Sequence, residues 1–305
     1  MRCMMEKINY NKNVGARFIE PGKKFIKKEA QKNNLKEKLN NLRKILSEMR
    51  SVLIAYSGGV DSTFLLKVAR EELGERVAAV TVKSEIHHLS EITDAKKMAQ
   101  KFKVKHLFMD IDILSNKEFV NNPPERCYIC KKEIFSRISE MAKELNFNFV
   151  ADGSNYDDLS DYRPGMKAVR ELKIRSPLQE ALLTKDDIRL LSKEMDLSTW
   201  DKPSNSCLAT RIPYRDEITL EKLKRIEQAE GFFHDLGIEQ VRVRHYNKLA
   251  KIEVREEDML LLIREDLRKK IIAKLKKLGF IYITLDLQGY RSGSMNEELK
   301  EKAEG

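Results

Sequence analysis

The sequence predicts an α/β protein in which a doubly wound parallel sheet is followed by a smaller C-terminal α+β domain. In the first two thirds of the chain, short apolar runs alternate with segments of helical periodicity, which is typical of parallel strands covered by helices. After about residue 201, the strand candidates instead alternate apolar and charged residues, as antiparallel strands do.

The first predicted domain covers residues 34–201. It opens with an amphipathic helix at 34–49 and an apolar strand at 51–56. Later strands are expected at 76–82, 105–110 and 148–151, and helices at 63–73, 90–102 and 131–145. Ligands of such sheets bind at the carboxyl ends of the strands. Val82, Lys83 and Gly153, which follow the second and fourth strands, are therefore expected to face a ligand.

Residues 202–305 form the second predicted domain. A helix at 220–236 precedes strands at 240–245 and 250–254, and one or two helices at 257–278 lead to a last strand at 282–287. Residues 1–33 are polar and lack a clear period, so we interpret them as a basic N-terminal extension.

The net charge of the chain is +10, and most of it lies near the N-terminus. Residues 1–50 hold 14 Lys and Arg against 5 Glu and no Asp, so the rest of the chain carries only about +1. A nearly neutral body argues against a nucleic-acid partner, and only the extension favours RNA contact. Neither a membrane span nor a signal peptide is apparent, so a cytoplasmic location is expected.

The segment Ser57-Gly58-Gly59-Val60-Asp61-Ser62 joins a predicted strand to a predicted helix. Glycines let the backbone approach an anion, and N–H groups at a helix N-terminus attract phosphate. Ser57 and Ser62 add hydroxyl donors, and Asp61 fits a Mg²⁺ bridge or bracing of the loop. The segment lacks Walker A spacing and resembles the PP-loop of the N-type ATP pyrophosphatases. That resemblance implies an adenine nucleotide alpha hydrolase-like fold and transfer of AMP from ATP to an oxygen.

Four further stretches resemble the LarE family of ATP-dependent sulfur transferases. They begin at Pro123, Asp152, Pro203 and Leu287 and read PPERCYICK, DGSNYDDLSDYRPG, PSNSCLATRIPY and LQGYRSGSMN. The resemblance implies that ATP adenylylates the carboxylates of a small nucleotide, pyridinium-3,5-biscarboxylic acid mononucleotide. Sulfur then displaces AMP to give thiocarboxylates for nickel-pincer cofactor synthesis. It also implies a homo-oligomer.

Three of the four cysteines, Cys127, Cys130 and Cys207, fall within these stretches, and Cys3 lies outside them. In single-cysteine members of the family, the residue that matches Cys207 gives up its own sulfur, but those members lack the Cys-x-x-Cys pair. The chain resembles instead the three-cysteine group, in which the triad holds a [4Fe–4S] cluster that leaves one iron without a protein ligand. Zinc at the triad, a sacrificial Cys207, and structural or redox thiols are the alternatives.

The resemblance assigns the phosphate end of the substrate to Arg211, Glu230, Arg242 and Arg244, with Thr210 assisting Arg211. Arginine suits phosphate because its planar fork donates two parallel hydrogen bonds. Arg242 and Arg244 alternate on one strand and therefore share a face. A solvated strand face is the alternative interpretation.

Two acidic residues, Asp158 and Asp161, follow the expected mouth of the sheet. They fit a role in holding Mg²⁺ or ribose, with turn residues as the alternative. The five histidines, which include His87, His88 and His245, show no metal or triad spacing and are expected to be core or surface residues.

Two other enzyme classes share the PP-loop. A tRNA thiolase also adenylylates its substrate and often uses three cysteines, but it usually carries zinc-ribbon cysteines or an RNA-binding domain, and the sequence shows neither. An amide-forming synthetase of the NAD synthetase kind uses ammonia and needs no cysteine triad. A non-enzymatic nucleotide sensor is a further alternative.

Overall fold

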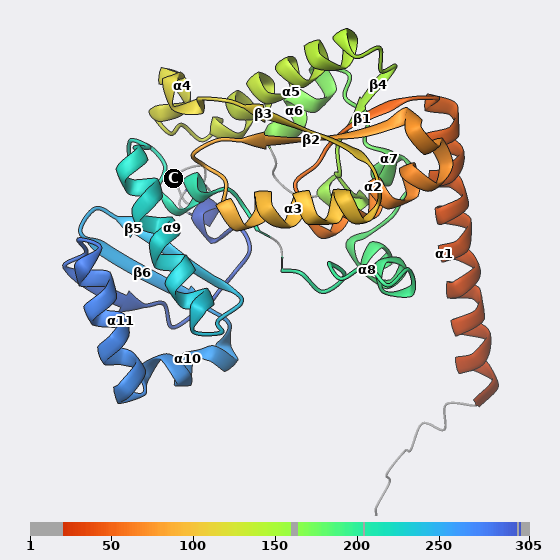
Figure 1. Ribbon diagram of the computed structural model, residues 1–305. Helices are drawn as coiled ribbons and strands as arrows, with labels where there is room; N and C mark the ends of the chain where they lie inside the picture. Colours follow the sequence, from red (N-terminus) through yellow and green to blue (C-terminus); the bar gives the residue numbers. More distant parts are fainter. Residues whose placement is uncertain (1–20, 160–163, 204, 298, 300–305) are drawn as a thin grey trace, which may run out of the picture.

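The computed structural model describes residues 21–159, 164–203, 205–297 and 299, and their side chains from residue 32 onward (Figure 1). The expected α/β architecture is confirmed. Four parallel strands in the order β3-β2-β1-β4 form the central sheet, and a separate three-stranded sheet in the C-terminal part has the order β5-β6-β7. Residues 1–20 of the predicted extension, Cys3 among them, lie outside the described residues.

The elements of the N-terminal part alternate as expected. Its strands are β1 (Val52–Ala55), β2 (Val77–Lys83), β3 (Lys105–Asp110) and β4 (Phe149–Ala151). Its helices are α1 (Pro21–Met49), α2 (Val60–Leu73), α3 (Leu89–Lys101), α4 (Lys117–Val120), α5 (Arg126–Glu144), α6 (Gly165–Glu171), α7 (Pro177–Glu180) and α8 (Lys185–Glu194).

The C-terminal part is built around an antiparallel pair. Its elements are α9 (Leu220–Asp235), β5 (Val241–Tyr246), β6 (Leu249–Val254), α10 (Glu256–Ile263), α11 (Glu265–Lys277) and β7 (Tyr282–Leu285). The expected antiparallel pairing of the first two strands is confirmed, and β7 adds to β6 in parallel.

Helices cover both faces of the central sheet, as its continuous apolar strands require (Figure 1). Val52 and Ile54 of β1 pack into a cluster with α1, α2, α3, α7 and α8. Leu53, which points the opposite way, packs with α5 and α6. The carboxyl ends of the strands are thereby left as the open edge at which a ligand can enter.

Three helices begin earlier than the sequence indicated. α1 starts at Pro21 rather than at 34, so part of the predicted extension is helical. α2 starts at Val60 rather than at 63, which places Asp61 and Ser62 in its first turn. α5 starts at Arg126 rather than at 131, two residues after Pro124, so Cys127 and Cys130 lie on a helix. Residues three apart on a helix share a face, so these two cysteines are neighbours.

A third apolar cluster joins the two parts of the chain. It combines Ile86, Phe119 and Cys130 of the N-terminal part with Leu208 and Ile226 of the C-terminal part. The core of the C-terminal part itself is a separate cluster around α9, β5, β6 and α11. The segment that carries Cys207 is therefore anchored by buried side chains on both sides.

Acid should destabilise the C-terminal part through His245, which is 2% exposed. Burial, together with nearby Arg225, lowers the pKa of His245 to about 4. In the unfolded chain the pKa is about 6.5. Below pH 6.5 the unfolded state therefore binds a proton that the folded state does not bind. The free energy of unfolding falls as the pH drops toward 4. Thermal melts between pH 7 and 4.5 should show this fall, and His245→Gln should make it shallower. If the melting temperatures of wild type and His245→Gln fell equally steeply with pH, the prediction would be contradicted.

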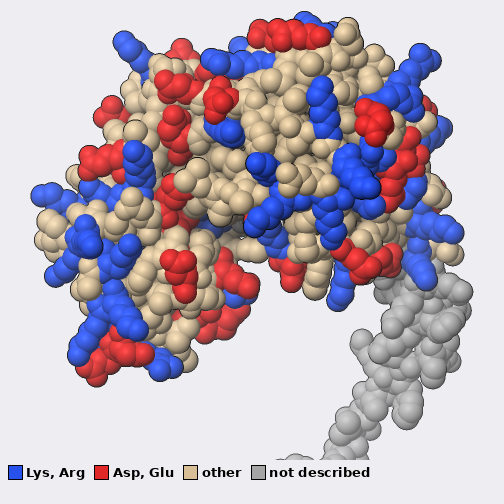
Figure 2. Space-filling view, viewed as in Figure 1, with Lys and Arg blue, Asp and Glu red and all other residues tan. Residues whose placement is uncertain are grey.

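The surface carries charges of both signs. In the view of Figure 2, lysine and arginine side chains are interspersed with aspartate and glutamate over both parts of the molecule. Among the described residues, no helix combines the length and the apolar character needed to cross a membrane.

Candidate active site

The loop Ser57–Ser62 lies at the carboxyl end of β1 and runs into the first turn of α2. Gly58 has φ of +72°, in the left-handed region that favours glycine, and a Cβ there would lie 3.1 Å from the Cα of Ala95. The Oγ atoms of Ser57 and Ser62 are 3.1 Å apart, and the N–H of Gly59 donates to Ser57 Oγ at 3.4 Å. Two hydroxyls thus lie beside the N-terminus of a 14-residue helix, where an anion binds favourably.

Asp61 is braced on one oxygen only. Its Oδ2 accepts from Lys185 Nζ at 2.6 Å and from Asn155 Nδ2 at 3.5 Å. Its Oδ1 is buried and has no hydrogen-bond partner among the described residues. A buried carboxylate oxygen without a partner is costly, and it fits a cation such as Mg²⁺ that is held together with phosphate.

Two of the three other predicted residues at the sheet edge lie at this loop or at its cavity, and the third, Lys83, packs on a neighbouring ring. A Cβ on Gly153 would lie 3.0 Å from the backbone nitrogen of Ser62, so the loop after β4 touches the PP-loop directly. Val82 lines the same cavity as Ser57. Lys83 places its Nζ 4.4 Å from the centre of the Phe108 ring.

The two acidic residues expected at the sheet mouth have different outcomes. The Asp158 carboxylate is buried and accepts from the N–H of Asn155 at 3.0 Å, as a turn residue does. Asp161 lies outside the described residues.

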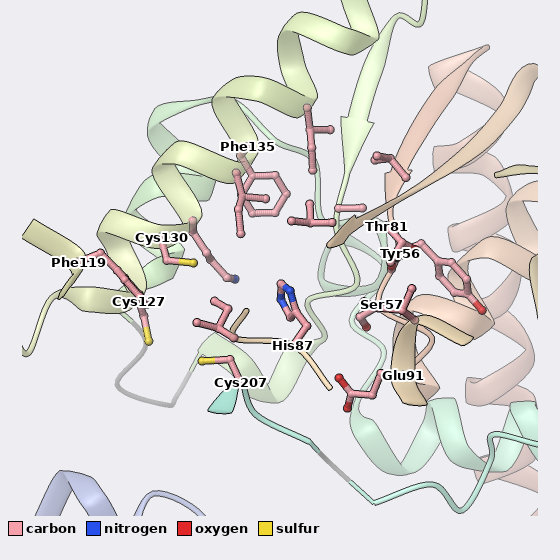
Figure 3. Close-up of a pocket in the computed structure, with 18 of the residues that line it drawn as sticks. Tyr56, Ser57, Thr81, His87, Glu91, Phe119, Cys127, Cys130, Phe135 and Cys207 are labelled. Carbon is pink, nitrogen blue, oxygen red and sulfur yellow. Dashed lines mark hydrogen bonds between the residues drawn. The ribbon is translucent and has the colours of Figure 1, made fainter. Parts of the chain in front are cut away.

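A cavity of about 310 Å³ connects the PP-loop to the cysteines. Ser57 lies at one end, and Cys127, Cys130 and Cys207 lie together at the other, with the ring of His87 between them (Figure 3). Apolar residues of β2 and α5 supply most of the walls, among them Val80, Val82, Ile134, Phe135 and Ile138. An activated ligand held at the loop therefore shares one chamber with three thiols.

The three thiols influence one another electrostatically. Burial raises the pKa of Cys130 well above its usual value, and the neighbouring Cys207 and Cys127 raise it further. Burial and Cys127 also raise the pKa of Cys207, although Arg126 and Arg211 oppose this shift. Without a metal these two groups are protonated thiols. A bound metal would reverse that, because the thiolate is the form that coordinates.

Among the described His, Cys, Asp and Glu side chains, no group of three is arranged to hold one metal ion. By chemistry alone, three thiols fit a [4Fe–4S] cluster with one iron free of protein ligands, and they also fit a zinc site with one open position.

Arg211 ties the Cys207 segment to the C-terminal part. Arg211 and Glu230 are both fully buried, and the guanidinium donates to the two carboxylate oxygens at 2.9 Å each. Its Nη1 donates to the carbonyl oxygens of Ser206 at 2.6 Å and Cys207 at 3.0 Å, and to Thr210 Oγ1 at 3.0 Å. The Glu230 pKa is lowered although burial alone would raise it, because Arg211 and His88 stabilise the carboxylate.

The other two arginines of the predicted phosphate site lie beside this pair. Arg244 is buried, donates to Glu253 Oε2 at 2.6 Å, and donates to the carbonyl oxygen of Thr210 at 2.9 Å. Arg242 is also buried, and its guanidinium lies 5.3 Å from the centre of the Tyr290 ring. The alternative of a solvated strand face is therefore wrong. The five predicted residues are brought together, and three arginines in this cluster face two carboxylates.

Several residues of the site were missed from the sequence. Lys185 is the ion-pair partner of Asp61, and Glu253 is the ion-pair partner of Arg244. Only the folded chain reveals these two pairings. Thr184 and Asp187, which form a capping box before α8, are a sequence signal that could have located Lys185. Arg126 and His87 line the cavity, and their positions depend on tertiary contacts that no spacing encodes.

Comparison with known proteins is consistent with both halves of the site. The family model described as queuosine biosynthesis protein QueC matches residues 51–122, which include the PP-loop. A pyridinium-3,5-bisthiocarboxylic acid mononucleotide synthase from Lactiplantibacillus plantarum is 37% identical over 252 residues, which cover 81% of this chain and 90% of that protein.

Two uncharacterised proteins are similar over comparable lengths. One, from Synechocystis sp., is 42% identical over 247 residues, covering 81% of this chain and 92% of its own length. The other, from Methanocaldococcus jannaschii, is 36% identical over 269 residues, covering 88% of this chain and 99% of its own length. The similarity therefore extends well beyond the PP-loop.

Proposed function

The chain belongs to the LarE family of pyridinium-3,5-bisthiocarboxylic acid mononucleotide synthases, and from this premise we propose that it is an ATP-dependent sulfur transferase of nickel-pincer cofactor synthesis. Its substrate is pyridinium-3,5-biscarboxylic acid mononucleotide. Each carboxylate is adenylylated at the PP-loop and then converted to a thiocarboxylate, with release of pyrophosphate and AMP. The observation that carries the proposal is the single cavity that holds both the PP-loop and three thiols.

The PP-loop residues act in the first half of the reaction. The α2 N-terminus and the hydroxyls of Ser57 and Ser62 bind the pyrophosphate of ATP and stabilise its charge as it departs. The Oδ1 of Asp61 would hold Mg²⁺, which would help to neutralise the phosphate charge, while Lys185 fixes the other oxygen. The substrate carboxylate needs this step because an ionised carboxylate is a poor electrophile until its oxygen becomes a leaving group.

Cys127, Cys130 and Cys207 would hold the [4Fe–4S] cluster. When bound, a cluster with three protein thiolates supplies an iron that can carry an external sulfide. This assignment is supported by the location of the three thiols at one end of one chamber. The protein's own contribution is to present the acyl group to the sulfur in a chamber with mostly apolar walls.

The arginine cluster would bind the phosphate of the substrate. Arg211 and Arg244 are each paired with a carboxylate, and Arg242 gives the cluster a net positive charge. Arg211 is fully buried and already donates to Glu230 and to the segment around Cys207, so its part in the cluster is to hold that segment in place. The homo-oligomer implied by the family resemblance stays a prediction.

Substrate-dependent pyrophosphate exchange tests the proposed function. Labelled pyrophosphate should enter ATP when the biscarboxylate mononucleotide is present, and added sulfide should then yield the thiocarboxylate, seen by mass spectrometry as exchange of oxygen for sulfur. Bulk tRNA and deamido-NAD serve as controls and should not support exchange. Exchange with tRNA alone would indicate a tRNA thiolase, and exchange with deamido-NAD would indicate an amide-forming synthetase; either would overturn the proposal.

Gly153→Ala should weaken ATP binding. The new Cβ would lie 3.0 Å from Ser62 N and 3.1 Å from Ser62 Cα, so the PP-loop must shift by a few tenths of an ångström. We expect the KM for ATP to rise roughly tenfold, because small displacements of positioning groups are costly. Gly231→Ala is the matched control: no atom outside the local α9 backbone lies within 4 Å of its Cβ, and alanine inside α9 should add about 0.5–1 kcal/mol of stability without changing the KM. Equal KM values for the two variants would contradict the prediction.

A further inference from the structure

His87 lies in the middle of the cavity, and the proposed function assigns it no role. Its ring lines the chamber between Ser57 and the cysteines (Figure 3). It follows β2 in the turn formed by residues 84–88, where the N–H of His87 donates to the carbonyl oxygen of Ser84 at 3.1 Å. Its side chain therefore enters the site from the carboxyl end of a strand, where ligands of such sheets bind.

One nitrogen of the His87 ring is held by the protein. The Nδ1 atom lies 3.1 Å from Ser84 Oγ. Among the described residues, this is the one hydrogen-bond partner of the Ser84 hydroxyl. The hydroxyl is placed to donate its proton to Nδ1, and in that tautomer the ring proton lies on Nε2. The Nε2–H group then points into the cavity, and no described residue accepts it.

The ring is neutral in the folded protein. Burial, together with His88, lowers the pKa of His87 to about 4. A neutral Nε2–H donor costs less to keep in an apolar chamber than an imidazolium would. It is suited to donate a hydrogen bond to an oxygen that gains negative charge.

The turn that carries His87 is fixed to the segment that carries Cys207. The N–H of Leu208 donates to the carbonyl oxygen of Ile86 at 2.8 Å. On the other side, His88 Nε2 lies 3.4 Å from Glu230 Oε2, and Glu230 binds Arg211, which in turn holds the carbonyl oxygen of Cys207. The residues on both sides of His87 are thus tied to the residues around Cys207, so the donor keeps a defined position relative to the thiols.

We propose that His87 is a catalytic residue that donates its Nε2 hydrogen to the acyl oxygen of the adenylylated substrate while sulfur attacks. The inference rests on the proposed function. The sulfur of hydrosulfide forms a bond to the acyl carbon, and the carbonyl electron pair moves onto the oxygen that His87 contacts. When that pair returns, the carbon–oxygen bond to AMP breaks, AMP leaves with the bonding electrons, and the S–H proton passes to solvent. His87 keeps its proton throughout, and no redox change occurs.

The two half-reactions separate this role from a structural one. His87→Leu removes the donor. It should lower the kcat for thiocarboxylate formation about 100-fold, the usual effect of deleting such a donor. Substrate-dependent pyrophosphate exchange and the KM for the substrate should stay within about twofold, and acyl-adenylate should accumulate in acid-quenched samples. Retention of full thiocarboxylate formation, or equal loss of both half-reactions, would overturn the proposal.

Two further variants keep the test decisive if His87→Leu does not fold. His87→Gln can place an amide N–H near the Nε2 position, whereas His87→Asn reaches only to the Nδ1 position, so the Gln variant should be at least tenfold more active. Equal activities would refute the donor role. Ser84→Ala should lower thiocarboxylate formation roughly tenfold through misorientation of the ring, and add nothing in the His87→Leu background.

The wild-type protein distinguishes this inference from the proposed function. If wild type shows neither exchange nor thiocarboxylate, the proposed function fails regardless of His87. If wild type shows both and His87→Leu matches it, only the role of His87 fails.

Discussion

Cys130→Ser is expected to abolish thiocarboxylate formation while substrate-dependent pyrophosphate exchange continues. The side chain is 8% exposed and lies beside Cys127 and Cys207, but it is remote from the PP-loop end of the cavity. A hydroxyl does not replace a thiolate as an iron ligand. Anaerobically purified wild type should be brown and contain about four irons per chain. The variant should lose the absorbance and the iron.

The choice of Cys130 separates the two sulfur sources. If Cys207 gave up its own sulfur, Cys130→Ser would still form one thiocarboxylate, and its mass would fall by that of hydrogen sulfide as Cys207 became dehydroalanine. Such a result, together with iron-free wild type, would contradict the cluster assignment. Cys3→Ser is the chemical control, because Cys3 lies outside the stretches that resemble the family, and it should leave iron content and activity unchanged.

Glu230→Ala should be the most destabilising single change in the arginine cluster. The carboxylate is fully buried, accepts two hydrogen bonds from Arg211, and accepts another from the N–H of Val243 at 2.9 Å. Its removal leaves the buried charge of Arg211 without a partner, which costs about 3–5 kcal/mol. For a chain of this size, the thermal midpoint should fall by roughly 10 °C.

A surface pair on the same helix provides the comparison. Glu221 is exposed and accepts a hydrogen bond from Arg225 at 2.6 Å. Glu221→Ala should cost less than about 1 kcal/mol, as exposed ion pairs do. The double variant Arg211→Met/Glu230→Leu should be more stable than Glu230→Ala, because both buried charges are gone. If Glu230→Ala and Glu221→Ala melt at the same temperature, the buried pair contributes no more to stability than the exposed pair.

The fold and the phosphate loop could be predicted because their signals are local. The apolar runs of β1 and β2 lie next to glycine or polar segments, and the SGGVDS loop has a spacing that few other structures use. The ends of the helices depend on signals that lie outside the apolar pattern. The sequence predicted a helix from 131, yet α5 begins at Arg126, two residues after Pro124, since proline is tolerated before and within the first helical turn.

The rest of the site depends on contacts between distant segments. Arg244 and Glu253 pair because β5 and β6 are antiparallel neighbours, and Asp61 meets Lys185 because two helices converge at one loop. His87 becomes a candidate site residue only because it lines a cavity whose walls come from β2, α5 and the segment around Cys207. Patterns within a short window predict elements, but they do not predict which side chains face one another.

The apolar cluster shared by Ile86, Phe119, Leu208 and Ile226 has a consequence for attempts to divide the protein. The pattern of the sequence changes near residue 201, which suggests that the two halves could be exchanged as separate modules. A fragment cut there would expose a fully buried patch on each side and would separate Cys207 from the other two thiols. The two halves should therefore unfold as one cooperative unit. A chimaera that replaces either half should also replace the residues of the shared apolar cluster.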